Sequence, residues 1–509
     1  MATDQLVTRS AATKWLITAT VMLVAVMEVL DITIVNVSLR DMMGAFGATV
    51  SQITWVVTAY VVASAIIMPM TGFLVDNIGR KRLLMINIVG FGITSILCGM
   101  STNLTEIIIF RALQGVFGAS LIPLSQYILR DTFSREELGK AMAVWSMGIL
   151  VGPILGPTLG GYITENLSWH WVFFINIPVC VLAFILATNL ITESEIKPKP
   201  IDWLALIFLA VGIGCLQTFI EEGSRNDWLH SNYILMLLVT SVFCIIAFII
   251  RCADNPHSLV NLSLFKDRQF TICTLILMFY CMALFGALVL QPLMLEVLMD
   301  YPPNQAGLVM APRGLAALLC MPFTPLLVKW FNAKRVITVG LLVTAFGTYC
   351  MSGWNLEVNM GTMAWIGVIQ GIGMGLTFSP LSTIVFATLH PKHIASAAGM
   401  FSFGRSLGLS IGVAALSTVL VEQTQINWNR LGGHLNNFNP NLHHWLQVQH
   451  LQITDPTVPM QLGNLLSAHA NIIAYLDSYW LTTLAFLAII PLIFFIKIGR
   501  MTKIEMGAH

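Results

Sequence analysis

Charged residues are scarce in this sequence. Only 10% of its 509 residues are Asp, Glu, Lys or Arg, whereas about a quarter of the residues in an ordinary soluble domain are charged. The 26 basic and 25 acidic residues leave a net charge of +1, so the chain lacks the basic surface that nucleic-acid binding requires. This composition argues against a soluble domain and against a nucleic-acid-binding protein.

Motifs for metal, disulfide and nucleotide chemistry are also missing. The nine cysteines lie in or beside apolar runs without a CxxC pair, so we interpret them as small hydrophobic residues. Four histidines between His434 and His450 are irregularly spaced and lack an acidic or cysteine partner, so no metal site is predicted. No GxxxxGK[ST] phosphate loop and no nucleophile–base pair is visible. We therefore expect no enzymatic activity and no cofactor, and an ion gradient as the source of energy.

Long apolar runs are abundant instead. Runs of roughly 20 mainly apolar residues recur along the chain, and each can cross a hydrocarbon core about 30 Å thick. In lipid only helices or a closed barrel satisfy the backbone, and runs without alternation exclude a barrel. The sequence thus predicts an all-α polytopic membrane protein. The fourteen predicted spans are 15–37, 53–71, 83–100, 105–129, 139–163, 171–191, 203–221, 232–251, 270–294, 305–328, 335–354, 361–387, 394–420 and 477–497.

The positions of the basic residues predict the orientation. The N-terminus, every second loop and the C-terminus hold 20 of the 26 Lys and Arg residues, whereas the opposite loops hold only Arg40, Arg225 and Arg430. By the positive-inside rule both termini are predicted to be cytoplasmic. The first run is expected to be a retained span of an inner-membrane protein, because Glu28 and Asp31 interrupt it and no cleavage site follows.

Two internal similarities predict related halves. GFLVDNIGRKR (72–82) and LLVKWFNAKR (326–335) follow the second and tenth spans, and FRALQGVFGASLIPLS (110–125) resembles GVIQGIGMGLTFSPLS (367–382). The repeat thus relates the second span to the tenth and the fourth to the twelfth. This spacing indicates six helices, an inserted pair and six more helices, with the substrate path between the two six-helix halves. The predicted divisions are a cytoplasmic N-terminus 1–14, a bundle 15–191, the inserted pair 203–251, a bundle 270–497 that includes an extracytoplasmic loop 422–476, and a cytoplasmic tail 498–509. That loop is either a tolerated insertion or a docking surface for a partner.

Ionisable residues inside spans are the first candidates for function, because each costs several kcal/mol in lipid. Glu28 and Asp31 are three residues apart in the first span, so both lie on one helical face. Two carboxylates in a low-dielectric cavity repel each other, so at least one is expected to exchange a proton near neutral pH. Arg111 needs a counter-ion, and either acid could supply it. The alternative is that these groups form a static, hydrogen-bonded ion pair.

Further candidates concern helix contacts and the substrate path. Gly148, Gly152 and Gly156 recur every four residues, which makes a groove for close helix approach. Prolines beside the glycines bend a helix, so a mobile interface between the halves is expected, with packing alone as the alternative. This motif continues with Pro157, Gly160 and Gly161. Candidates for the substrate path, each of which could instead be a structural anchor, are Gln114, Glu222, Arg313 and Arg405.

Together these motifs resemble those of the major facilitator superfamily. The similar segments are the signature loop 72–82, RALQG (111–115), the antiporter motif 148–161, LDITIVNV (30–37) and WHWVFFINIP (169–178). The segment 30–37 is similar to the first-span motif of fourteen-span drug:proton antiporters. IPLSQ (122–126) and FNPN (438–441) are similar to segments of the EmrB-type multidrug exporters within that branch.

The resemblance implies proton antiport that extrudes hydrophobic drugs or toxic compounds. It also implies an EmrA-type periplasmic adaptor and an outer-membrane channel as partners. Asp31 and Arg111 match positions for proton coupling, to which Glu28 adds an extra acid, while the second-half loop keeps Lys329, Lys334 and Arg335 without an acid. The implied cytoplasmic gate is Gly72, Asp76, Gly79, Arg80 and Lys81. A dedicated exporter of a siderophore or another secreted metabolite, and a non-transporting receptor or scaffold, are the alternatives.

Overall fold

The protein is helical throughout the part that the structure describes. The computed structural model describes residues 10–254, 258–436, 438–448 and 457–496, and these contain no β-strand. The first helices are α1 (Ala11–Phe46), α2 (Val50–Ile53), α3 (Trp55–Ile67), α4 (Thr71–Ile78), α5 (Arg80–Gly99), α6 (Leu104–Gly118), α7 (Leu121–Thr132), α8 (Arg135–Asn166), α9 (Trp171–Phe174) and α10 (Asn176–Leu190). The others are α11 (Trp203–Gly223), α12 (Asn232–Asp254), α13 (Arg268–Leu293), α14 (Pro303–Cys320), α15 (Thr324–Phe331), α16 (Ala333–Met351), α17 (Met360–Ile384), α18 (Ile394–Gly432), α19 (Pro440–Val448) and α20 (Val458–Phe494).

Most of these helices are long and apolar enough to cross a membrane. Twelve helical runs in the described residues meet that standard, and a bent pair within α8 raises the number to thirteen. The predicted span 335–354 corresponds to α16, which is not among them. Its first turn contains Lys334 and Arg335, which lower its mean hydropathy. The all-α prediction is confirmed, while the number fourteen remains a prediction.

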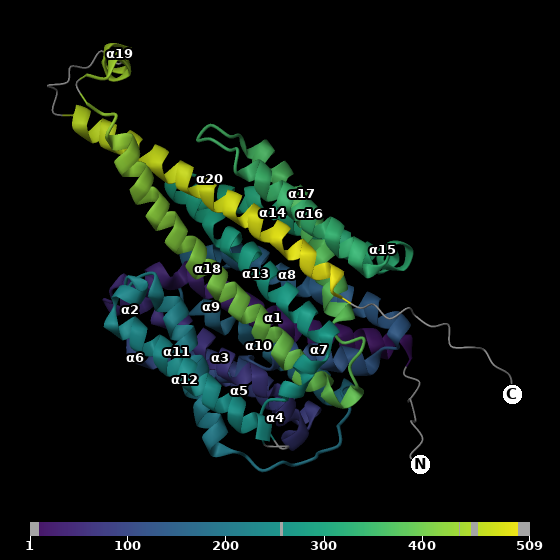
Figure 1. Cartoon of the computed structure of the whole chain (residues 1–509). Helices are drawn as coiled ribbons and strands as arrows, with labels where there is room; N and C mark the ends of the chain where they lie inside the picture. The colour runs from purple at the N-terminus through teal and green to yellow at the C-terminus, as the bar shows by residue number, and fades with distance from the viewer. Residues whose placement is uncertain (1–9, 255–257, 437, 449–456, 497–509) are drawn as a thin grey trace.

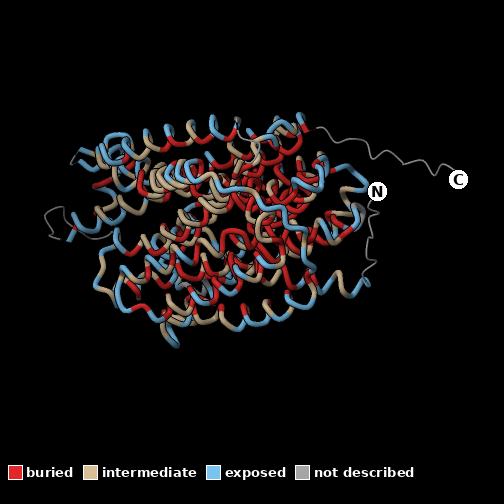
Figure 2. The backbone as a smooth tube through the Cα atoms, turned by 90° about the horizontal axis from the view of Figure 1, so that it is seen from below, coloured by how far each residue is buried: buried red, intermediate tan, exposed pale blue. Residues whose placement is uncertain are grey.

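The outer surface of the bundle is apolar, as expected for lipid contact. Buried residues concentrate in the middle of the bundle and exposed ones at its periphery (Figure 2). Many of the exposed residues are large and hydrophobic, which water would disfavour but lipid accepts. On α5, α10 and α12 they include Ile86, Val89, Ile93, Val181, Ile185, Val239, Phe243, Ile246 and Ile250.

The helices pack in two groups, with α11 in contact with both. In the first group α1 packs on α8 and α10, and α6 packs on α3 and α5. In the second group α13 packs on α18 and α20, and α17 packs on α14 and α16. Helix α11 contacts α3 of the first group and α18 of the second, and α12 packs against α11 (Figure 1). The two groups are called the N group (α1–α10) and the C group (α13–α20) below.

The internal repeat is visible in the backbone. A short 3₁₀ turn precedes α4 at Met68–Met70 and another precedes α15 at Met321–Phe323. Helix α4 ends at Gly79 (φ 88°, ψ 147°), and α15 ends at Asn332 with nearly the same angles (φ 72°, ψ 142°). A positive φ suits glycine and strains a residue with a Cβ atom. The second loop therefore keeps the backbone of the first, although it has lost the acid.

Helices α18 and α20 extend well beyond the length of a membrane span. They contain 39 and 37 residues, more than 50 Å each at about 1.5 Å per residue. Their ends run together past the rest of the bundle and lead to α19 (Figure 1). The described part of the stretch 422–476, predicted to be a loop, is thus largely helical: the two extensions pack on each other, and Thr424 donates to Asn471 across them. We call the segment 422–476 the α18–α20 hairpin.

Candidate functional site

A fully buried ion pair lies inside the N group. Arg111 Nη1 on α6 donates to Asp31 Oδ2 on α1 at 2.6 Å, and neither side chain is exposed. Removing two charges from water costs several kcal/mol each, and only a close pair with further hydrogen bonds offsets that cost. Of the two acids that the sequence left open as the counter-ion of Arg111, Asp31 is the one in contact.

Neutral amides complete the surroundings of Asp31. Asn176 Nδ2 on α10 donates to Asp31 Oδ1 at 2.7 Å, and Gln114 Nε2 donates to the same oxygen at 3.1 Å. Both amides also reach Ser95 Oγ on α5, at 3.1 and 3.3 Å. Gln114, predicted to line the substrate path, therefore belongs to the network around Asp31.

Further contacts hold the Arg111 guanidinium. Its Nε donates to the carbonyl of Val56 at 3.2 Å, and its Cζ lies 4.4 Å from the centre of the Tyr60 ring, a cation–π arrangement. Sequence reasoning did not single out Ser95 or Tyr60, which carry no local signal. Asn176 was within reach of such reasoning, because it stands in the segment 169–178 quoted above.

Glu28 lies outside this network. Its Oε2 accepts from the backbone N–H of Ile122 at 3.1 Å, and its Oε1 has no hydrogen-bond partner among the described residues. Ile122 is in the first turn of α7, where the helix dipole favours a negative charge. Arg405 on α18 interacts with Glu28 electrostatically without forming an ion pair within 4 Å. Glu28 thus faces the C group, whereas Asp31 is enclosed within the N group.

The predicted gate residues contact α7, the last turn of α10 and the linker that follows α10. Asp76 Oδ2 accepts from Lys199 Nζ at 2.7 Å, and Lys81 Nζ donates to the carbonyl of Thr188 at 2.6 Å. Arg80 pairs with Asp131 at the end of α7 and also donates to Thr192. These bonds lie within the N group and its linker, so they fasten the loop to its own half.

The two groups touch directly beside this loop. A Cβ atom added to Gly72 would lie 2.6 Å from the Cα of Ser396, and one added to Gly399 would lie 2.5 Å from the carbonyl oxygen of Met68. Only glycine permits such an approach of two backbones. Helix α18 is therefore in contact with α4 and with the 3₁₀ turn before it, at the end of the bundle where the gate was predicted.

The antiporter-motif glycines face α1 rather than the C group. A Cβ atom would lie 2.7 Å from Val29 Cγ1 if added to Gly152 and 2.1 Å from Thr33 Oγ1 if added to Gly156. Thr33 Oγ1 also donates to the Gly152 carbonyl at 3.1 Å. The expected interface between the halves is thus wrong for these glycines, because α1 of the same group fills the groove. The glycines at which an added Cβ atom would lie within about 3 Å of α1 are Gly148, Gly152, Gly156 and Gly160.

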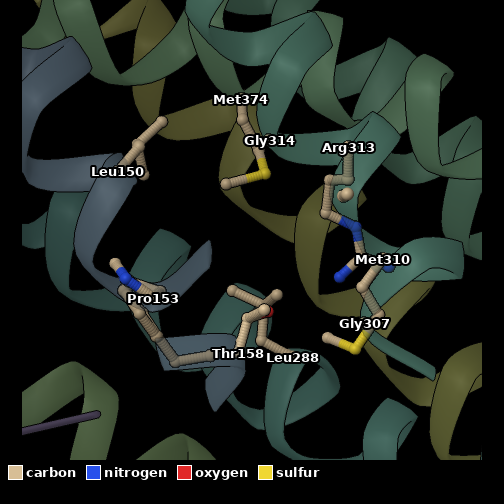
Figure 3. A pocket seen from close by; sticks show the side chains of 11 residues that line it. Leu150, Pro153, Thr158, Leu288, Gly307, Met310, Arg313, Gly314 and Met374 are labelled. Atoms are coloured by element: carbon tan, nitrogen blue, oxygen red, sulfur yellow. The ribbon is translucent and has the colours of Figure 1, made fainter. Parts of the chain in front are cut away.

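Helix α8 nevertheless contacts the C group through the side of the helix that faces away from α1. It is bent by 43° between Glu137–Pro153 and Thr158–Asn166, the region of its Gly-Pro pairs. It contacts α14 and α17. A cavity of about 60 Å³ lies there, lined by Leu150, Pro153, Thr158, Phe285, Leu288, Gly307, Met310, Ala311, Arg313, Gly314 and Met374 (Figure 3). Drug-sized ligands need about 300 Å³ or more, so a larger cargo requires the groups to move apart.

Arg313 lines this cavity, while Glu222 does not. Arg313 on α14 is buried and donates to Gln291 on α13. Figure 3 places it across the cavity from Leu150 and Pro153. Glu222 bonds within its own turn, to Arg225 at 3.5 Å and to Asn226 at 3.3 Å. These local bonds agree with the structural anchor at the end of α11, which was one of the two roles predicted for Glu222.

The neighbouring acid Glu221, which the sequence analysis overlooked, takes part in a contact between helices. Gln217 Nε2 on α11 donates to Glu221 Oε1 at 3.2 Å and to Ser410 Oγ on α18 at 2.5 Å. These bonds connect the inserted pair to the C group. Glu222 drew attention by its position at the outer surface, and periodicity alone could not distinguish it from Glu221.

Comparisons with known proteins agree with this geometry. Residues 21–413 match the Major Facilitator Superfamily. The chain is 34% identical over 492 residues to the multidrug export protein EmrB of Haemophilus influenzae, with 95% of each chain covered. It is 33% identical over 494 residues to the fatty acid resistance protein FarB of Neisseria gonorrhoeae, covering 96% of this chain and 97% of FarB. A solved structure of a double-tryptophan mutant of XylE matches 96% of each chain with a TM-score of 0.61 and 15% identity.

The chain therefore belongs to the major facilitator superfamily, whose members are secondary transporters rather than enzymes. Within that superfamily it is an EmrB-type multidrug exporter. The family predicted from the motifs is confirmed, and so is the all-α superfamily fold, while the fourteen spans and the cytoplasmic termini stay predictions.

Proposed function

We propose that the protein exports hydrophobic drugs or other toxic compounds across the inner membrane by proton antiport. The observation that carries this proposal is the fully buried Asp31–Arg111 pair. A scaffold or receptor has no need to bear the desolvation of two charges inside a membrane bundle. A carrier does need a carboxylate whose charge changes when it binds a proton.

The coupling step follows from the contacts of Asp31. When Asp31 binds a proton, the Arg111 guanidinium loses its counter-ion and the pair weakens. Helix α1, which carries Asp31, packs along the glycine face of α8, whose other side lines the cavity between the groups. A shift of α1 would therefore be transmitted to the cavity wall. Glu28, which faces Arg405, is a second group that proton binding would affect.

Transport in proteoliposomes tests this proposal. The wild-type protein should move N-phenyl-1-naphthylamine, a neutral hydrophobic fluorophore, when a pH gradient is imposed, and ligand addition to the purified protein should release protons. Asp31→Asn should lose both effects, because an amide cannot exchange the proton. The matched control is Asp41→Asn, which changes an exposed acid near the end of the same helix. Unaltered gradient-driven transport in Asp31→Asn would contradict the assignment.

We also propose that the protein is the inner-membrane part of a tripartite pump, with both termini in the cytoplasm. The distribution of basic loops supports this orientation, which places the α18–α20 hairpin outside the cytoplasm. The hairpin presents exposed apolar side chains, among them Phe438 (94% exposed) and Met460 (72% exposed). A periplasmic adaptor of the EmrA type is the partner that the family suggests for this hairpin.

A further inference from the structure

The C group contains a buried cation that has no anionic partner. Arg313 is 5% exposed, and no carboxylate lies within 4 Å of it among the residues that the structure describes. Its only hydrogen-bond acceptor there is the side-chain oxygen of Gln291, which is itself 1% exposed. Arg313 Nε and Gln291 Nε2 both lack a partner in the described part of the chain. Two adjacent donors are thus left unsatisfied.

A buried guanidinium without an anionic partner, such as that of Arg313, carries a desolvation cost that no ion pair offsets. Buried charged groups are normally paired, and unsatisfied buried donors are rare. In the N group the charge of Arg111 is paired with Asp31 at 2.6 Å, although Arg111 Nη2 also lacks a hydrogen-bond partner among the described residues. The exception at Arg313 points to an acceptor that comes from outside the chain. A guanidinium presents several N–H groups in a plane, which suits the two or three oxygens of a carboxylate or sulfonate, and the neighbouring Gln291 amide offers a further N–H donor.

The surroundings of Arg313 indicate what the rest of such a ligand is like. The cavity that Arg313 lines is otherwise mostly apolar (Figure 3). Two of its walls carry Met310 and Met374, whose flexible thioether chains adapt to different shapes. Leu150 and Pro153 of α8 form the opposite wall, so a molecule held there touches both groups.

We propose that Arg313 and Gln291 bind the anionic group of amphipathic cargo, a hydrophobic carboxylate or sulfonate whose apolar body lies against Leu150 and Pro153. This inference rests on the proposed export function and names the substrate class for the same path. Arg313 is then a residue that determines specificity, because it favours anions over neutral molecules with the same apolar body.

A pair of fluorophores that differ mainly in charge tests this proposal. 8-Anilinonaphthalene-1-sulfonate is an anion, and N-phenyl-1-naphthylamine has the same aromatic body without the sulfonate. Binding of each to the full chain in lipid nanodiscs is measured by fluorescence, with empty nanodiscs subtracted. Arg313→Gln should weaken binding of the anion about tenfold or more, because hydrogen bonds to a charged group are strong, and should leave binding of the neutral probe unchanged. Arg313→Lys should retain part of the affinity for the anion.

A second variant tests the charge without removing the arginine. Gln291→Glu places a carboxylate beside Arg313, so the site becomes neutral and should lose affinity for the sulfonate while the neutral probe still binds. The control is Arg335→Gln, which removes an exposed arginine of α16 that does not line the cavity.

The outcomes separate this inference from the proposed function. If Arg313→Gln and Gln291→Glu leave binding of the sulfonate unchanged, or weaken binding of both probes equally, the anion site is refuted. If the wild-type protein fails to move the neutral probe under a pH gradient, the proton-antiport proposal fails instead, whatever the result with the sulfonate.

Discussion

The carboxylates of Asp31 and Glu28 lie one helical turn apart, yet their surroundings differ. Asp31 accepts hydrogen bonds from Arg111, Gln114 and Asn176, all within the N group. Glu28 accepts a single bond from a helix N-terminus and faces the C group. Side chains that share a face of α1 therefore belong to two different electrostatic environments, which suits two different steps of a transport cycle.

Asn176 provides a test of the Asp31 network by a single substitution. Asn176→Leu removes the 2.7 Å donor to Asp31 Oδ1. A hydrogen bond to a charged group contributes about 1.5–3 kcal/mol, so transport of N-phenyl-1-naphthylamine should slow about tenfold. The control Asn189→Leu changes an exposed residue of the same helix and should transport at the wild-type rate. Transport by Asn176→Leu at the rate of that control would count against the network.

Among the helices, the contact between α1 and α8 depends on glycine. Gly156→Ala would place a Cβ atom 2.1 Å from Thr33 Oγ1. Overpacking of a tight contact costs about 1–3 kcal/mol, so the thermal unfolding temperature of the purified protein should fall. Gly161→Ala is the matched control, since its Cβ atom would lie 4.0 Å from Val37, an ordinary contact. Equal unfolding temperatures of the two variants would show that α1 does not pack against Gly156.

The α18–α20 hairpin allows a test at its tip. Phe438 is 94% exposed there, and Phe494 is 77% exposed at the other end of α20. If the hairpin binds an adaptor, Phe438→Ser should abolish drug resistance in cells that express the whole pump and leave transport in proteoliposomes intact. Phe494→Ser should preserve resistance. Full resistance with Phe438→Ser would argue that the tip does not take part in docking.

For the whole molecule, we propose that the contact of α18 with α4 beside the signature loop closes this end in one state of an alternating-access cycle. A transporter must open this end when the opposite end closes. The backbone contacts at Gly72 and Gly399 form and break in that exchange, if the groups move as units.

Gly399→Leu tests this closure directly. The added side chain would clash with the carbonyl of Met68, so the α4–α18 contact should open. Hydrogen–deuterium exchange should then rise in peptides covering residues 68–78 and 391–400, and transport should fall at least about tenfold. Gly44→Leu is a control in α1, because no atom lies within 4 Å of a Cβ at that position. Unchanged exchange in Gly399→Leu would mean that this contact is not the closure.

Much of this protein could be predicted from the sequence because the lipid solvent imposes simple local rules. Backbone groups must be satisfied within each segment in lipid, so apolar runs predicted helices and their approximate bounds. Asp31 and Arg111 stood out because charges inside spans are expensive. The motifs 72–82 and 148–161 indicated the family, and the matching backbone angles of Gly79 and Asn332 agree with the internal repeat.

The tertiary structure decided which groups meet, since that depends on residues far apart in the chain. It paired Arg111 with Asp31 rather than Glu28 and added Asn176, which lies 145 positions from Asp31. It turned the antiporter glycines toward α1 and extended α18 and α20 through a stretch whose polar composition predicted a loop. Hydropathy and spacing report the surroundings of one segment, whereas neighbours across helices are set by packing of the whole bundle.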